Sequence, residues 1–138
     1  MSCENKHFCR FVSTALFIGR GSFGDVFGPC DWNGKKCAIK TRWIKKDDTE
    51  KQLSACRKMM SLQHRRLIKV YDVSLEPNAL YILMEYAGGG TLRTVLSSRQ
   101  SDFPLEILMD WSTQIAEGMA YLHEKNIVHR DLKSLNSE

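Results

Sequence analysis

Three glycines near the start of the chain, Gly19, Gly21 and Gly24, have a spacing that suits phosphate binding. Glycine lacks a Cβ, so backbone N–H groups there can approach a phosphate closely. The same spacing occurs in the dinucleotide-binding turns of oxidoreductases, where a helix must begin directly after the glycines. Here Asp25-Val26-Phe27 continues in the pattern of a strand. The sequence therefore disfavours a dinucleotide site and leaves two alternatives, a hairpin that covers phosphates and a hairpin with a purely structural role.

A lysine and a charged loop are the other residues that could act in such chemistry. Lys40 ends a short apolar segment and follows Val26 by 14 positions, so a hairpin of that length returns it beneath the glycines. By itself, a lysine in a strand is most often a solvated edge residue. The segment from His129 to Asn136 carries several charged and polar residues after a helical pattern. Taken alone, it fits an ordinary surface loop.

In combination, these segments resemble the protein kinases. Gly19 to Val26, together with Cys37-Ala38-Ile39-Lys40, is similar to the kinase glycine loop and third-strand lysine. His129-Arg130-Asp131-Leu132-Lys133-Ser134-Leu135-Asn136 matches the kinase catalytic loop at each defining position. The resemblance covers Phe17 to Asn136 and implies transfer of the γ-phosphate of ATP to a protein hydroxyl.

The resemblance also implies a role for each matching residue. Asp131 is expected to accept or orient the proton of the substrate hydroxyl, Lys133 to place positive charge near the transferred phosphoryl group, and Asn136 to bind Mg²⁺. Lys40 is expected to hold the α- and β-phosphates of ATP. The expected nucleotide-binding residues are Gly19, Arg20, Gly21, Ser22, Phe23, Gly24, Val26, Ala38, Lys40, Met84, Glu85 and Ala87.

Two segments indicate the kind of kinase. Lys133 is similar to serine/threonine kinases, and the stretch from Met84 to Leu92 looks like the tyrosine-kinase-like group. Within that group the chain resembles mitogen-activated protein kinase kinase kinases. Among these, the resemblance is strongest to the transforming-growth-factor-β-activated kinases and second to the mixed-lineage kinases. The resemblance implies a protein substrate that is itself a downstream kinase, and an adaptor or scaffold protein as a further partner.

The sequence departs from the family pattern at two places. Family members carry a glutamate in the helix after the third strand, as the partner of the strand lysine, but Ala55 stands at that position. The nearest acid, Glu50, lies five residues earlier, on a different face of the helix. Without its partner, Lys40 is expected to be less well oriented for catalysis.

The second departure is at the end of the chain, where Ser137-Glu138 follow Asn136 and no Asp-Phe-Gly motif appears. We therefore expect a kinase sequence that is truncated after the catalytic loop and transfers little or no phosphate as it stands. The alternative is a catalytically dead, shortened kinase-like protein that acts as a binding or decoy module.

The elements that must position these residues follow from the hydrophobic pattern. Strands are predicted around the glycines, at Cys37–Lys40, at Leu67–Val73 and at Leu80–Glu85, with a two-residue turn at Asn33-Gly34. Helices are predicted from Thr49 for about four turns, at Thr91–Leu96, and from Pro104 to His123. Leu108, Trp111, Ile115, Met119 and Leu122 give the last helix one apolar stripe.

This order predicts an α+β fold, with a kinase-like N-lobe of five antiparallel strands and one helix, followed by the first helices of an incomplete helical C-lobe. The expected divisions are a tail at residues 1–13, the N-lobe and hinge at 14–87, and a partial C-lobe at 88–138.

Composition excludes several other classes of protein. The net charge of +4 is mild and the charges are interspersed, so nucleic-acid binding and a polybasic membrane contact are not expected. The five cysteines are odd in number and contain no Cys-x-x-Cys pair, which disfavours a disulfide framework and a zinc site. No signal peptide or membrane span is apparent at the start or elsewhere. The sequence predicts a cytoplasmic protein with reduced thiols.

Overall fold

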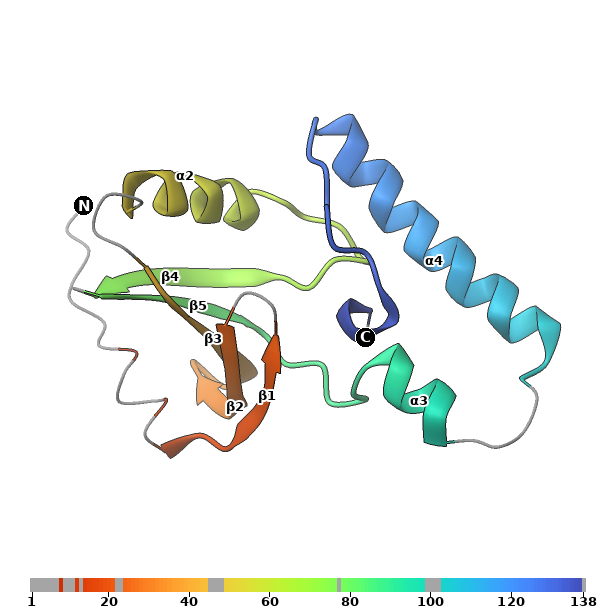
Figure 1. Ribbon diagram of the computed structural model, residues 1–138, viewed down its shortest axis with the longest axis horizontal. Helices are drawn as coiled ribbons and strands as arrows, with labels where there is room; N and C mark the ends of the chain where they lie inside the picture. The colour runs from red at the N-terminus through yellow and green to blue at the C-terminus, as the bar shows by residue number, and fades with distance from the viewer. Residues whose placement is uncertain are drawn as a thin grey trace. The chain divides into compact units, whose positions relative to one another are not determined.

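Two compact units make up the computed structural model of the chain (Figure 1), which describes residues 8, 12, 14–21, 24–44, 49–76, 78–98 and 103–137. The first unit contains residues 1–63 and 68–86, and the second contains residues 64–67 and 87–138. Of the tail predicted at residues 1–13, only Phe8 and Val12 are among the described residues. None of the described helices combines the length and apolarity needed to cross a bilayer.

The first unit is built on a five-stranded sheet. The strands are β1 (Phe17–Gly21), β2 (Gly24–Trp32), β3 (Lys35–Trp43), β4 (Val70–Glu76) and β5 (Ala79–Glu85). Their spatial order is β1-β2-β3-β5-β4, and all neighbours are antiparallel, which confirms the predicted sheet.

The β2–β3 turn confirms the prediction from Asn33-Gly34. Their φ angles are 55° and 75°, and Trp32 lies opposite Lys35, as in a two-residue hairpin of mirror-image turn geometry. Asn and Gly tolerate this left-handed backbone better than other residues do.

One face of the sheet holds the apolar core of this unit. Cys37, Ile39 and Leu83 are each at most 1% exposed and pack with Phe8, which is 1% exposed. Because side chains alternate along a strand, Ala38 and Lys40 lie on the opposite face of β3. The core thus fixes which residues of β3 face away from it.

The helix α2 (Thr49–Met60) accompanies the sheet of the first unit. Its 12 residues make about three turns, one fewer than predicted, and Ser61 and Leu62 close it by donating to the carbonyls of Lys58 and Met59. Cys56 is buried, and Arg42 of β3 donates from Nη1 to Gln52 Oε1 at 3.0 Å. This hydrogen bond holds α2 to β3.

The second unit is helical. It contains α3 (Leu92–Ser98), α4 (Leu105–Glu124) and the short 3₁₀ helix η2 (Ser134–Asn136). The helix predicted from Pro104 to His123 is present, but it runs from Leu105 to Glu124, and Pro104 is the residue directly before it. Of the predicted apolar stripe, Leu122 is 5% exposed, whereas Leu108 at the other end of the stripe is 37% exposed.

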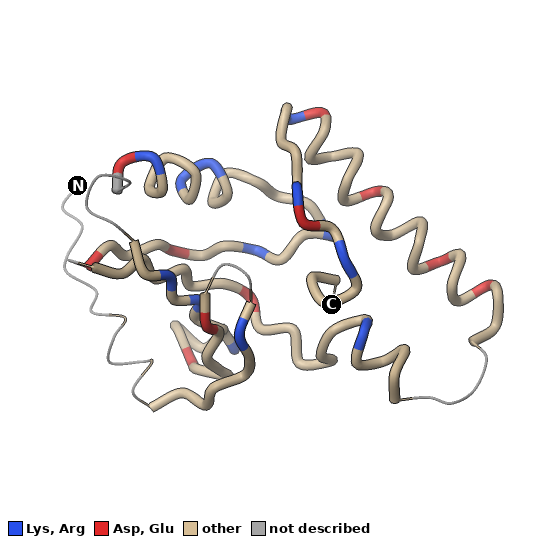
Figure 2. Tube along the Cα trace, in the orientation of Figure 1, with Lys and Arg blue, Asp and Glu red and all other residues tan. Residues whose placement is uncertain are grey.

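Residues 64–67 belong to the second unit, although they connect α2 to β4 in sequence. We name this tetrapeptide, His64 to Leu67, the anchor segment. Figure 2 shows that α4 carries acidic residues and no lysine or arginine. The two arginines of the anchor segment are therefore complementary in charge to α4.

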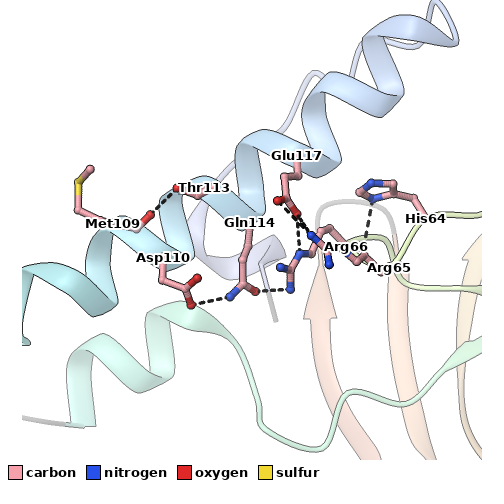
Figure 3. A network of polar contacts seen from close by, with 8 residues as sticks. All are labelled: His64, Arg65, Arg66, Met109, Asp110, Thr113, Gln114 and Glu117. Atoms are coloured by element: carbon pink, nitrogen blue, oxygen red, sulfur yellow. Dashed lines mark hydrogen bonds and ion pairs between the residues drawn. The ribbon is translucent and has the colours of Figure 1, made fainter.

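Arg65 and Arg66 make this complementarity specific (Figure 3). Arg65 Nη2 and Arg66 Nε donate to Glu117 Oε2 at 3.0 and 2.9 Å. Arg66 Nη1 donates to Gln114 Oε1 at 2.8 Å, and Gln114 Nε2 donates to Asp110 Oδ2 at 2.7 Å. Hydrogen bonding from Arg66, and then from Arg65, lowers the pKa of Glu117.

The anchor segment also explains why β4 begins later than predicted. The sequence places a strand at Leu67–Val73, but β4 starts at Val70. The Leu67 N–H donates to the His64 carbonyl at 3.1 Å in a turn, and the His64 ring stacks on Tyr121 with centroids 4.9 Å apart. Leu67 is thus held against α4 instead of joining the sheet.

Candidate active site

The glycine segment forms the tip of the β1–β2 hairpin. Gly21 lies opposite Gly24, and Gly19 lies opposite Val26. Gly24 has a φ of 129°, and a Cβ there would overlap the carbonyl oxygen of Thr41, so glycine is required at this position. The intervening Ser22 and Phe23, which were predicted to contact nucleotide, lie outside the described residues.

An ion pair spans the hairpin next to its tip. Arg20 lies opposite Asp25, and its Nε and Nη2 donate to Asp25 Oδ1 and Oδ2 at 2.7 and 3.2 Å. The hydrogen bond from Arg20 lowers the pKa of Asp25, and the same contact raises the pKa of Arg20. Sequence analysis missed this pair, although two opposite charges placed symmetrically about a glycine turn were a visible signal.

Several predicted nucleotide-binding residues share one face of the sheet. Val26 lies opposite Lys40 across β2 and β3, and Ala38 lies opposite Met84 across β3 and β5. Since directly opposed residues point to the same face, these four side chains lie together on the face away from the Phe8 core. Ala38 is 4% exposed, and Lys40 and Met84 are half-buried. The arrangement offers a mainly apolar surface with one cation.

The predicted hinge residues fall at the end of β5. Glu85 is the last residue of this strand, and its N–H donates to the Lys69 carbonyl at 2.9 Å. Ala87 follows in the second unit. Ala55 lies on α2 and is exposed. Its correspondence to the helix glutamate of the family stays a prediction from the sequence.

In the second unit, the loop after α4 brings three predicted residues together. Lys133 Nζ lies 3.0 Å from Asp131 Oδ1, and Asn136 Nδ2 donates to Asp131 Oδ2 at 3.0 Å. Asn136 Nδ2 also donates to the Asp131 carbonyl at 2.7 Å. The Asp131 carboxylate thus has one oxygen held by an ammonium group and the other by an amide.

The backbone of this loop depends on its neighbours. Arg130 has a φ of 65°, and the Asp131 N–H donates to His129 Nδ1 at 3.3 Å. The Asn136 N–H donates to the Lys133 carbonyl at 2.8 Å within η2, and the Ser137 carbonyl accepts from the Leu92 N–H at 2.7 Å. The sequence did not predict the left-handed backbone conformation of Arg130 or the hydrogen bond between Leu92 and Ser137.

Electrostatics favour the ionised form of Asp131. The hydrogen bond from Lys133 is the main cause that lowers its pKa, the bond from Asn136 adds to it, and partial desolvation opposes both. An ionised carboxylate beside a cation can orient a hydroxyl and receive its proton.

The side chains of this loop can offer few ligand atoms to Mg²⁺. Within the described residues, no group of three or more His, Cys, Asp or Glu side chains could hold a metal ion. Both hydrogen bonds of the Asn136 amide use its nitrogen, so the amide presents its oxygen as a ligand atom. Mg²⁺ takes few protein oxygens when it also binds phosphates and water. Asn136 fits that mode.

Comparison with known proteins decides the family. The family model described as protein tyrosine and serine/threonine kinase matches residues 12–137. The chain belongs to this family. The predicted resemblance to protein kinases is therefore confirmed, and both the glycine hairpin and the catalytic loop fall within the matched residues.

The relatives of this kinase chain include mitogen-activated protein kinase kinase kinases, as the sequence predicted. It is 38% identical over 127 residues to mitogen-activated protein kinase kinase kinase 10 of Homo sapiens and 37% identical to that of Mus musculus. It is 35% identical over 130 residues to mitogen-activated protein kinase kinase kinase 3 of Arabidopsis thaliana. The matches cover 86–87% of the chain but only 13–21% of these relatives.

A solved structure shares the fold. The crystal structure of Rad53 residues 1–466 in complex with AMP-PNP matches with a TM-score of 0.77 and 25% sequence identity. The match covers 88% of this chain and 32% of that chain. The α+β kinase fold predicted from the sequence is confirmed.

Proposed function

We propose that this chain supplies the nucleotide-binding and catalytic-loop parts of a serine/threonine protein kinase of the mitogen-activated protein kinase kinase kinase type. The reaction is transfer of the γ-phosphate of ATP to a protein hydroxyl. The observation that carries the proposal is the Asp131 carboxylate held by Lys133 at 3.0 Å and by Asn136 at 3.0 Å. The relatives named above support the same class of reaction.

In this reaction Asp131 orients the acceptor hydroxyl and receives its proton. The hydroxyl oxygen forms a bond to the γ-phosphorus as the bond from that phosphorus to the β–γ bridging oxygen breaks, and ADP leaves with the electron pair. Lys133 places positive charge where negative charge gathers on the transferred group. Its contact with Asp131 holds both groups in place before substrate arrives.

The nucleotide is proposed to bind to the first unit. Gly19, Gly21 and Gly24 present backbone to the phosphates, and Lys40 contributes a positive charge to them. Val26, Ala38 and Met84 form the apolar surface for the base; their place on the Lys40 face supports this assignment. Mg²⁺, held in part by the Asn136 amide oxygen, would neutralise phosphate charge when bound.

A protein substrate, itself a downstream kinase, and an adaptor or scaffold are the partners proposed from the family. A cytoplasmic location is part of the proposal, and it is supported by free thiols at Cys30, Cys37 and Cys56 among the described cysteines.

Phosphate transfer from ATP to a generic protein substrate tests the proposal. Whatever rate the parent protein shows, Asp131→Asn should lower it by roughly 10²- to 10⁴-fold, the usual contribution of a general base. Glu124→Gln, which removes an exposed carboxylate from α4, should leave the rate unchanged. Transfer that is equally fast in Asp131→Asn would contradict the assignment.

A second candidate function is a kinase-like binding module without catalysis, and Ala55 on α2 favours it. In protein kinases a glutamate of this helix forms an ion pair that positions the strand lysine for phosphoryl transfer, and an alanine side chain at position 55 cannot supply that carboxylate. The same assay separates the two candidates, because a binding module binds nucleotide or protein but shows no transfer that depends on Asp131.

A further inference from the structure

The Arg20–Asp25 pair lies beside the proposed phosphate site, but on the other face of the sheet. Asp25 lies opposite Thr41, whereas Val26 lies opposite Lys40. Successive residues of a strand point to opposite faces, so Asp25 points away from the face that carries Lys40. Both guanidinium contacts of Arg20 go to this carboxylate. The pair therefore joins β1 to β2 on the face of the sheet opposite to Lys40, where a nucleotide lying against Lys40 does not reach.

This end of the hairpin has few other side chains that could hold β1 on β2. Gly19, Gly21 and Gly24 contribute none, although cross-strand side-chain contacts are what stabilise a ladder. The aromatic contact between Phe17 and Phe27, with centroids 5.7 Å apart, lies at the opposite end of β1. Arg20 is thus the β1 residue that can fix the strand close to the tip.

Asp25 in turn is fixed to the third strand. Thr41 Oγ1 donates to the Asp25 carbonyl at 3.4 Å, and the Gly24 backbone lies directly against the Thr41 carbonyl. Thr41 follows Lys40 in β3. A continuous set of contacts therefore runs from Arg20 through Asp25 to the residue next to the proposed phosphate-binding lysine.

We propose that Arg20 and Asp25 form a positioning pair, which sets the place of the glycine backbone relative to Lys40 without touching the nucleotide. The proposal rests on the function proposed above. It differs from the expectation that Arg20 binds phosphate directly, and the two accounts predict opposite effects for Asp25. If the pair positions the hairpin, loss of Asp25 disorders the hairpin and weakens nucleotide binding. If Arg20 binds phosphate directly, loss of Asp25 frees Arg20 for the phosphate and strengthens binding.

Binding of Mg-ATP to four variants tests the proposal: Arg20→Ala, Asp25→Asn, the charge swap Arg20→Asp/Asp25→Arg, and a control. The control is Lys35→Ala, which removes an exposed lysine at the start of β3, on the face of that strand away from Lys40. We expect both single variants to weaken binding roughly two- to fivefold, the range of an exposed ion pair. The swap should return affinity to within about twofold of the parent protein. The differences should shrink at high salt, because exposed charges are screened.

Three outcomes overturn the positioning pair: unchanged affinity in both single variants, tighter binding in Asp25→Asn, or a swap as weak as Arg20→Ala. The last two indicate direct phosphate contact by Arg20. Amide hydrogen exchange of residues 19–26 without nucleotide gives an independent reading. Exchange should be faster in both single variants and restored by the swap, and unchanged exchange contradicts the proposal. Failure of the parent protein to bind Mg-ATP refutes the proposed function instead, and the exchange result still decides the pair.

Discussion

Asp131 is the residue whose chemistry depends most on its neighbours. Its carboxylate shares contacts with Lys133 and Asn136, and the hydrogen bond from Lys133 is the main cause of its lowered pKa. The sequence motif predicted which three residues matter. It could not predict the pairing of each carboxylate oxygen, because that depends on the left-handed backbone at Arg130 and on the turn of η2.

Replacement of Lys133 by Met should raise the pKa of Asp131. The pKa of Asp131 is lower in the folded protein than in the unfolded chain, where it is about 3.9. The contact with Lys133 therefore stabilises the folded protein fully at pH values above this unfolded pKa. That contribution is lost as pH falls through the lower, folded pKa. Carboxyl-carbon NMR titration of parent and Lys133→Met proteins measures the shift, with Lys125→Met as the control on an exposed lysine. An unchanged Asp131 titration in Lys133→Met would show that the contact does not set its charge.

At the scale of elements, the hydrophobic pattern predicted all five strands and the helices α2, α3 and α4. The predicted start of β4 at Leu67 was wrong, because tertiary contacts hold the anchor segment away from the sheet. Arg65 and Arg66 reach Glu117, which lies 52 and 51 positions further along the chain, respectively. No local periodicity reports a contact between residues so far apart in sequence.

Glu117→Gln should loosen the anchor segment from α4. The substitution keeps the size of the side chain but removes the charge shared by the two arginines. Exchange of the Leu67 amide, which donates to the His64 carbonyl, should rise roughly two- to fivefold, as for other exposed ion pairs. Hydrogen exchange read out by mass spectrometry or NMR checks this effect. Glu124→Gln on the same helix serves as the matched control, and equal exchange in both variants would show that Glu117 does not hold the segment.

At the scale of the whole molecule, the chain combines a sheet unit and a helical unit that each carry part of one family's motifs. The order of elements was enough to predict this α+β fold, since strands cluster first and helices follow. The anchor segment was not predictable, because it joins the helical unit by contact while it lies between two elements of the sheet unit in sequence. Ala55 is a different case: the sequence predicts a departure from the family pattern there, and the side chain is exposed on α2.

The central claim is that the face of the sheet carrying Lys40 binds ATP. Equilibrium binding of Mg-ATP tests it most directly, with Lys40→Met compared with Lys35→Met, which replaces an exposed lysine on the opposite face of the same strand. A charge-assisted contact to phosphate contributes about 1.5–3 kcal/mol, so Lys40→Met should weaken binding by roughly tenfold or more, and Lys35→Met should bind as the parent protein does. Equal affinity in the parent and Lys40→Met proteins would contradict the claim.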